Sequence, residues 1–257
     1  MKQTFIGICL IPLLFSFLPA CSGGPQPEEA PPVDGGFEEP EYLFELAPPG
    51  DGLPVSVFPE IWGYLVAGRE SALSGSLPLS DVGYFGAEID VYGKLTDVPN
   101  PRNIRNFSGR VHMVVACNSR SLTHFILKEG SAERRALVSD LLNAVKNFDG
   151  LQIDFEYIPQ RDGGAFFSFL EELRAALDGK IFTIALPART RTLNNDIFDY
   201  RRISPLVDRV LVMAYDEHWS TSAPGPIASL PWCKRVAEYA LSVIGREKLI
   251  MGLPFYG

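Results

Sequence analysis

The feature that most constrains the fold is an alternation of short apolar runs with helical patterns. Seven runs of apolar or β-branched residues have the length of strands: 61–67, 82–89, 111–117, 151–157, 181–186, 210–215 and 249–253. Helical periodicity fills several of the gaps between them, most clearly over 131–148, 165–177 and 231–244. Strands that alternate with helices form right-handed βαβ units around a parallel sheet. We therefore predict an α/β fold.

Two architectures are built from such units, an open doubly wound sheet and a barrel. A doubly wound sheet normally has a Gly-rich phosphate-binding turn after its first strand, and the first run, IWGYLVAGRES, has none. The pattern therefore favours a (β/α)8 TIM barrel over residues 55–257. A closed barrel needs eight strands, so we expect a barrel that lacks the eighth. Either the sequence is a truncated record of a longer chain or the barrel is open.

The first twenty residues differ from the rest of the chain. Lys2 precedes a nearly continuous apolar stretch over 5–18, which is too short to span a bilayer comfortably and is typical of a secretory signal peptide. The stretch ends in LPAC, which resembles a bacterial lipobox and predicts lipidation at Cys21. The alternative is an ordinary signal peptide whose cleavage site falls near a cysteine. The lipobox predicts a protein anchored to a bacterial membrane, facing the periplasm or the exterior.

Residues 21–54 are rich in Pro, Gly and Glu, and such a composition does not bury enough apolar surface to fold. We interpret this segment as a tether between the lipid and the barrel domain.

Cys117 and Cys233 lie far apart without metal-type spacing, and two buried free thiols are favoured over a disulfide. A net charge of −8 without basic clusters argues against a nucleic-acid partner. We expect a monomer without a metal ion or another cofactor.

The fourth apolar run carries an unusual polar face. Within FDGLQIDFEYIP, residues 148–159, alternate side chains are polar and share one side of a strand. These side chains are Gln152, Asp154 and Glu156. Central barrel strands normally have two apolar faces, because buried polar groups are costly unless they are paired. The alternatives are a solvated edge strand and a strand that carries an active site at its carboxyl end.

The residues DGLQIDFE, 149–156, resemble the D-G-x-D-x-D-x-E motif of glycoside hydrolase family 18, except that Gln152 replaces an Asp. Downstream, Met213, Tyr215 and Asp216 resemble the family's M-x-Y-D motif. The segment around YDEHW, PGPIASLPW and GLPFYG is similar to the subgroup of spore-cortex and cell-wall N-acetylglucosaminidases. The resemblance covers roughly residues 55–257.

The resemblance implies a role for each motif residue. Glu156 would donate a proton to the leaving glycosidic oxygen and then act as a base toward water. Asp154 would hold the N–H of the sugar's acetamido group, and Tyr215 would orient its oxygen for attack on the anomeric carbon. Asp216 would contribute to sugar binding or to the local electric field, and Asp149 would support the strand at its entry.

Three further residues, Gln152, Tyr64 and Trp219, are candidates for substrate binding. Packing is an equally good interpretation of Tyr64.

The substrate implied is an N-acetylated oligosaccharide or polysaccharide, either peptidoglycan or a chitin-like glycan. The alternatives are a chitinase, an enzyme that cuts host glycoproteins internally, and a glycan-binding lipoprotein without turnover. The last is favoured by the lack of any Trp after Trp232, since the family's eighth strand usually brings one to the site of cleavage.

Lipidation at Cys21 predicts where the protein is found after cell fractionation. Replacement of Cys21 by Ala should release the domain from the membrane fraction, because the tether has no apolar anchor of its own. Immunoblots of membrane and soluble fractions would measure this. A Cys21→Ala variant that stays in the membrane fraction would show that another segment holds it there.

Overall fold

The computed structural model describes residues 58–105 and 107–256. The predicted signal peptide (1–20), Cys21 and the tether (21–54) lie outside the described residues. The barrel domain is described from Phe58 to Tyr256, apart from residue 106. No helix within these residues is long and apolar enough to cross a bilayer.

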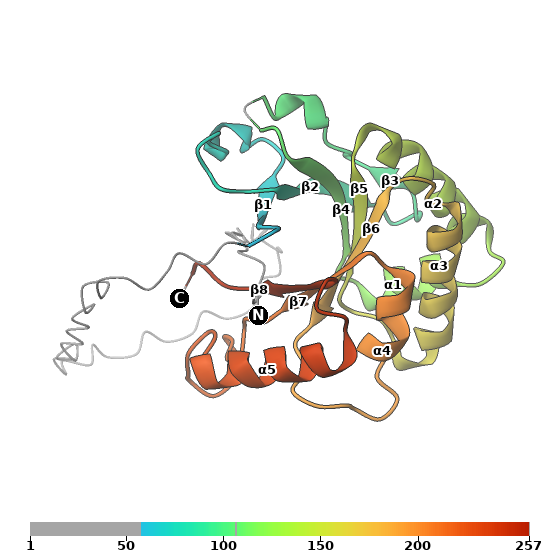
Figure 1. The fold of residues 1–257 in the computed structure, drawn as a ribbon. Coiled ribbons are helices and arrows are strands. Elements are labelled where there is room, and N and C mark those ends of the chain that lie inside the picture. The colour runs from blue at the N-terminus through green and yellow to red at the C-terminus, as the bar shows by residue number, and fades with distance from the viewer. Residues whose placement is uncertain (1–57, 106, 257) are drawn as a thin grey trace, which may run out of the picture. The chain divides into compact units, whose positions relative to one another are not determined.

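Seven parallel strands form one curled sheet, in the order β1-β2-β4-β5-β6-β7-β8 (Figure 1). Their bounds are Trp62–Val66, Asp81–Ile89, Arg110–Cys117, Gly150–Phe155, Ile181–Pro187, Arg209–Met213 and Leu249–Gly252. A short strand, β3 (Leu95–Thr96), pairs antiparallel with the end of β2. Within the described residues no strand lies between β1 and β8 and pairs with both, so the sheet does not close and forms an incomplete barrel. The predicted barrel without an eighth strand is confirmed.

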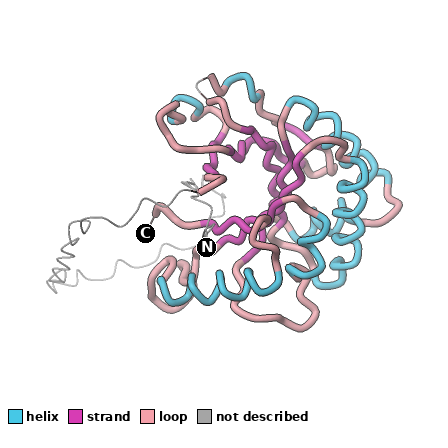
Figure 2. The backbone as a smooth tube through the Cα atoms, viewed as in Figure 1, coloured by secondary structure: helices cyan, strands magenta, loops and turns pink. Residues whose placement is uncertain are grey.

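The helices cover the outer face of this sheet (Figure 2). They are α1 (Arg120–Leu127), α2 (Ala132–Ala144), α3 (Gly163–Ala176), α4 (Tyr200–Ile203) and α5 (Leu230–Val243). The helix predicted over 131–148 is α2 with a 3-10 turn after it, and Ser131 caps it by accepting a hydrogen bond from the N–H of Arg134 at 3.1 Å. The sequence did not predict α1 or α4, because both are shorter than the window in which helical periodicity is visible.

Apolar side chains fill both sides of the curled sheet. The outer core lies between strands and helices and includes Phe155 of β5, which stacks on Phe169 of α3 with ring centroids 5.9 Å apart. A smaller inner cluster fills the curl itself. Its buried members come from β1, β6, β7 and β8: Trp62, Ala185, Leu211 and Ile250. The interior is therefore a packed core, as in complete barrels.

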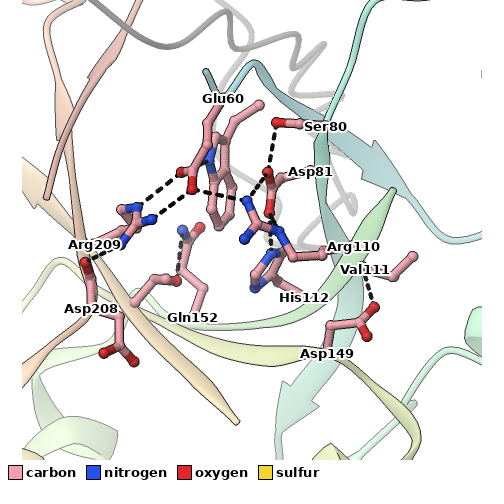
Figure 3. Close-up of polar contacts among 12 residues, drawn as sticks. Glu60, Ser80, Asp81, Arg110, Val111, His112, Asp149, Gln152, Asp208 and Arg209 are labelled. Carbon is pink, nitrogen blue, oxygen red and sulfur yellow. Dashed lines mark hydrogen bonds and ion pairs between the residues drawn. The ribbon is translucent and has the colours of Figure 1, made fainter. Parts of the chain in front are cut away.

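A network of charges closes the amino-terminal end of the curl (Figure 3). Glu60, just before β1, accepts hydrogen bonds from Arg209 of β7 at 2.9 and 2.6 Å and pairs with Arg110 of β4 at 2.9 Å. Arg110 also forms a two-pronged pair with Asp81 of β2, at 2.7 and 2.8 Å. Asp81, Arg110 and Arg209 are each the first residue of their strands. The network thus joins strands from both ends of the sheet.

Two residues of this network are fully buried, Asp81 and His112. The His112 Nε2 lies 2.7 Å from Asp81 Oδ1, and the ring packs against Trp62 with centroids 4.3 Å apart. Burial alone would raise the pKa of Asp81, but hydrogen bonds from His112, Arg110 and Ser80 outweigh it, and the pKa is lowered. Burial opposes a low pKa at Glu60 too, and hydrogen bonds from Arg209 and Arg110 again lower it.

These lowered pKa values predict how stability depends on pH. A carboxyl whose pKa is lower in the folded state stabilises the protein above its unfolded pKa, and this contribution is lost as pH falls through the folded value. Replacement of Glu60 by Gln should therefore lower the free energy of unfolding at pH 7 by about 2–3 kcal/mol, since Arg209 loses its charged partner and Arg110 keeps only Asp81. The difference should shrink as pH falls below about 4.

Denaturant unfolding of the parent and the Glu60→Gln variant at several pH values measures this difference. Glu129→Gln is a matched control, since Glu129 is exposed and has no partner among the described residues. Equal unfolding midpoints for Glu60→Gln and Glu129→Gln at pH 7 would contradict the assigned role of the network.

Candidate active site at the carboxyl ends of the strands

Strand β5 separates its side chains as the sequence predicted. Leu151, Ile153 and Phe155 belong to the outer core beneath the helices. Gln152 and Asp154 point to the other side, into the curl. At the entry of the strand, Asp149 accepts a hydrogen bond from the N–H of Val111 at 2.7 Å and so ties β5 to β4. The predicted orientation is confirmed for the residues within the strand.

Gln152 lies below the site, and its amide is held at both ends. Its Oε1 accepts a hydrogen bond from the hydroxyl of Tyr64 on β1 at 2.5 Å, and its Nε2 donates to Thr183 Oγ1 on β6 at 3.2 Å. Gln152 is fully buried, whereas Tyr64 is only partly so. Contact between Gln152 and a sugar would require the amide to leave both partners. Its role in substrate binding, and that of Tyr64, stay predictions.

Asp154 is the next inward residue and is 9% exposed. Its Oδ1 is buried and has no hydrogen-bond partner among the described residues. Burial is the main cause that raises the pKa of this carboxyl to about 7, and the charge of Glu156 raises it further. A buried acceptor without a partner is rare in folded proteins. Its presence here indicates a place where a donor from a ligand is accommodated.

Glu156 follows the last residue of β5 and reaches the surface of the site. The side chain keeps contact with solvent, so its carboxyl is only partly shielded from water. Surrounding protein atoms raise the pKa of Glu156 by desolvation, and the charge of Asp216 raises it further. Like charges at one site disfavour ionisation of both groups. Glu156 is thereby biased toward the protonated form that a general acid needs.

Tyr215 and Asp216 follow strand β7 and belong to the same end of the sheet. Asp216 has φ of 59°, a left-handed conformation that is uncommon outside glycine. It accepts a hydrogen bond from the hydroxyl of Tyr256 at 2.8 Å, and the Tyr215 and Tyr256 rings meet edge to face at 6.3 Å. The chain after β8 therefore holds the chain after β7. No sequence pattern predicted this contact with Tyr256.

The loop after Tyr215 presents Trp219, whose side chain is 59% exposed. Its indole N–H donates to Thr221 Oγ1 at 2.8 Å, which fixes the ring while a face stays open to solvent. His218 pairs with the carbonyl of Ala223 at 2.8 Å. An exposed and fixed aromatic face suits stacking on a sugar, so the structure leaves Trp219 as a candidate for substrate binding.

A cleft of about 240 Å³ opens beside Glu156. Its walls come from the loops after β4, β5 and β6, and include Arg120, Tyr157, Gln160, Arg189, Asp196 and Phe198. Sequence reasoning missed all of these. The signal was present for Arg120 and Arg189, because each follows a predicted strand by a few residues, where barrel sites are built.

Two cysteines and two histidines are titratable groups outside the motifs. Cys117 and Cys233 are both free thiols, as predicted, but only Cys117 is buried, and the prediction of a buried thiol is wrong for the partly exposed Cys233. His124 pairs with Asp162 at 2.9 Å, and His112 belongs to the network at the opposite end. No group of three or more His, Cys, Asp or Glu side chains is placed to hold a metal ion within the described residues. The chemistry that the site offers is that of its three carboxyl groups and its phenols.

Comparison with known proteins relates this geometry to a family. Residues 85–257 match the family described as Glycosyl hydrolases family 18. The chain is 34% identical over 148 residues to YdhD of Bacillus subtilis (strain 168), which is named as a sporulation-specific glycosylase, and the match covers 54% of this chain and 34% of YdhD. It is 28% identical over 204 residues to the cortical fragment-lytic enzyme of the same organism, covering 74% of this chain and 47% of that enzyme.

The fold is also shared with a solved structure, the spore cortex-lytic enzyme SleL of Bacillus cereus. The TM-score is 0.67 at 22% identity, and the match covers 76% of this chain and 50% of that chain. At this identity the likeness establishes the fold alone. The chain spans between a third and a half of the length of the two curated relatives.

Burial of Asp154 predicts that the site destabilises the protein. A carboxyl whose pKa rises from 3.8 to about 7 on folding costs stability as pH rises from about 4 to about 7, because the folded state holds the proton more tightly. At pH 8 the free energy of unfolding of Asp154→Asn should therefore exceed that of the parent, by a few kcal/mol at most. Its unfolding midpoint should lie at a higher denaturant concentration. The gain should vanish near pH 4.

Denaturant titrations at pH 4, 6 and 8 measure this effect. Asp178→Asn is the control, because Asp178 is exposed and should change stability by no more than about 0.5 kcal/mol. An Asp154→Asn variant that is less stable than the parent at pH 8 would show that the carboxylate has favourable partners in the folded state.

Proposed function

The chain belongs to glycosyl hydrolases family 18, and on this premise we propose that it hydrolyses β-glycosidic bonds of N-acetylglucosamine in peptidoglycan or a chitin-like glycan. The observation that carries the proposal is the buried Asp154 Oδ1, which has no hydrogen-bond partner among the described residues and belongs to a carboxyl whose pKa is raised by burial and by the charge of Glu156. The family is one of the groups in which the substrate's own acetamido oxygen replaces an enzymic nucleophile. Such chemistry needs an acid for the leaving group and an acceptor for the acetamido N–H.

In the first step, the acetamido oxygen attacks the anomeric carbon while the bond from that carbon to the glycosidic oxygen breaks. Glu156 donates its proton to the departing oxygen, and the sugar becomes a cyclic oxazolinium ion. Asp154 accepts a hydrogen bond from the acetamido N–H and balances the positive charge. The hydroxyl of Tyr215 donates to the acetamido oxygen and sets its angle of attack. Asp216 binds the sugar and keeps Glu156 protonated through its charge.

In the second step, water attacks the anomeric carbon from the face that the leaving group vacated. The Glu156 carboxylate takes a proton from this water, the carbon–oxygen bond of the oxazolinium ring breaks, and the acetamido group is restored. The configuration at the anomeric carbon is retained because it is inverted twice. Glu156 returns to the protonated state in which the cycle began.

The setting of this activity is part of the same proposal. The name of one relative, the cortical fragment-lytic enzyme, supports a wall glycan over an intracellular substrate. We place the domain outside the cytoplasmic membrane, held by a lipid at Cys21 and separated from the bilayer by the tether over 21–54.

Substrate assistance predicts which sugars are cleaved. The full-length protein should hydrolyse an aryl β-N-acetylglucosaminide but not the matching β-glucoside, which lacks the acetamido group. Glu156→Gln should lower kcat by about 10²–10⁴-fold, because an amide cannot donate the proton as an acid. Release of the aryl group measures both. Glu129→Gln is the control, since Glu129 is exposed and lies outside the motifs of the site.

Two outcomes would contradict the proposal. Cleavage of the glucoside at a comparable rate would exclude assistance by the acetamido group. Equal binding of N-acetylated oligosaccharides by the parent and Glu156→Gln, with cleavage by neither, would assign the protein to glycan binding without turnover.

A further inference from the structure

Of the proposed catalytic residues, only Glu156 lines the cleft beside it. Neither Asp154 nor Tyr215 lines that cleft. Those two residues would hold the acetamido group of the sugar whose bond is cut. Glu156 protonates the oxygen that joins this sugar to the leaving group. A cleft that is lined by Glu156 but by neither Asp154 nor Tyr215 suits the leaving-group sugar better than the sugar whose acetamido group those two residues would hold.

One wall of the cleft is rigid and electrically balanced. Arg189, after β6, forms a two-pronged ion pair with Asp196 at 2.7 and 3.1 Å, and its guanidinium lies 5.9 Å from the centroid of the Phe198 ring. Gln160, after β5, donates to the carbonyl of Asn195 at 2.5 Å. These contacts tie the two loops together. The positive charge of Arg189 is neutralised within the wall.

Arg120 also lines the cleft, but no residue that the structure describes balances its charge. It is the first residue of α1 and is exposed. Its guanidinium forms no ion pair or hydrogen bond with any residue that the structure describes, although it lines the same cleft as Glu156. When Glu156 is protonated, as the reaction requires, the cleft carries one uncompensated positive charge. A planar guanidinium is suited to two-pronged pairing with a carboxylate.

We propose that this cleft binds an amino sugar that bears a carboxylate, as N-acetylmuramic acid does on its lactyl ether, and that Arg120 pairs with that carboxylate. The inference rests on the proposed function and narrows its substrate from N-acetylated glycans in general to the acidic glycan of the cell wall. A neutral chitin-like sugar in the same place would partly desolvate Arg120 without giving it a partner. Arg120 thus determines specificity and takes no part in bond cleavage.

Two substrates that differ only in charge test this inference. One is the β-1,4 disaccharide of N-acetylglucosamine and N-acetylmuramic acid, and the other carries the lactyl group as its amide. For the full chain, kcat/KM should be higher for the acid. Arg120→Gln should lower the ratio of the two kcat/KM values roughly tenfold, since it removes a hydrogen bond to a charged group. Arg120→Lys should keep part of the preference, because it keeps the charge and loses the planar fork.

Arg161→Gln is the matched control, because Arg161 is exposed, immediately follows Gln160 and does not line the cleft. It removes the same charge from the protein and should leave the ratio unchanged. An equal fall of the ratio in Arg161→Gln would trace the preference to overall charge, and an unchanged ratio in Arg120→Gln would overturn the inference while the proposed function stands.

Cleavage of neither disaccharide by the parent would count against the proposed function, and binding then decides the inference. The Kd values of the two disaccharides, measured by calorimetry with the parent and Arg120→Gln, should show tighter binding of the acid only where Arg120 is present. Equal Kd values for acid and amide in the parent would overturn the assignment of Arg120.

Discussion

The carboxyl of Asp154, buried on the inner face of β5, is the constraint on which the site depends. No described residue bonds its Oδ1. Burial and then the charge of Glu156 raise its pKa, and burial and then the charge of Asp216 raise the pKa of Glu156. Three carboxyl groups so placed cannot all ionise at little cost. Asp154 therefore has a pKa of about 7, far above that of a carboxyl in water, and its unmet acceptor favours a ligand that brings a donor.

A site of this kind has to be supported from elsewhere, and the support lies at the opposite end of the strands. Glu60, before β1, bonds Arg209 of β7 and so connects the two ends of an open sheet (Figure 3). Trp62 fills the interior just above this network. The division resembles the general plan of barrels, in which one end carries chemistry and the other stability. Both ends depend on polar groups that point into the curl.

The sequence predicted what depends on local pattern, namely the seven strands, the longer helices and the inward face of β5. It could not predict contacts between segments far apart in the chain. The amide of Gln152, a predicted site residue, accepts a hydrogen bond from Tyr64, which lies 88 positions away in the sequence, and no local pattern indicates this contact. Arg120 and Arg189 line the same cleft because they follow β4 and β6, which both pair with β5. The Glu60 network spans 149 positions and left no motif.

The central claim is that the acetamido oxygen of the substrate is the nucleophile. Asp154 accepts a hydrogen bond from the acetamido N–H, and Glu156 protonates the leaving oxygen. Aryl N-acetylglucosaminides whose acetyl methyl carries one, two or three fluorine atoms test this most directly, because each fluorine weakens the carbonyl oxygen as a nucleophile. With the full-length protein, kcat/KM should fall steeply and progressively with each fluorine. A rate that does not change across the series would show that the oxygen does not attack, and would contradict the account.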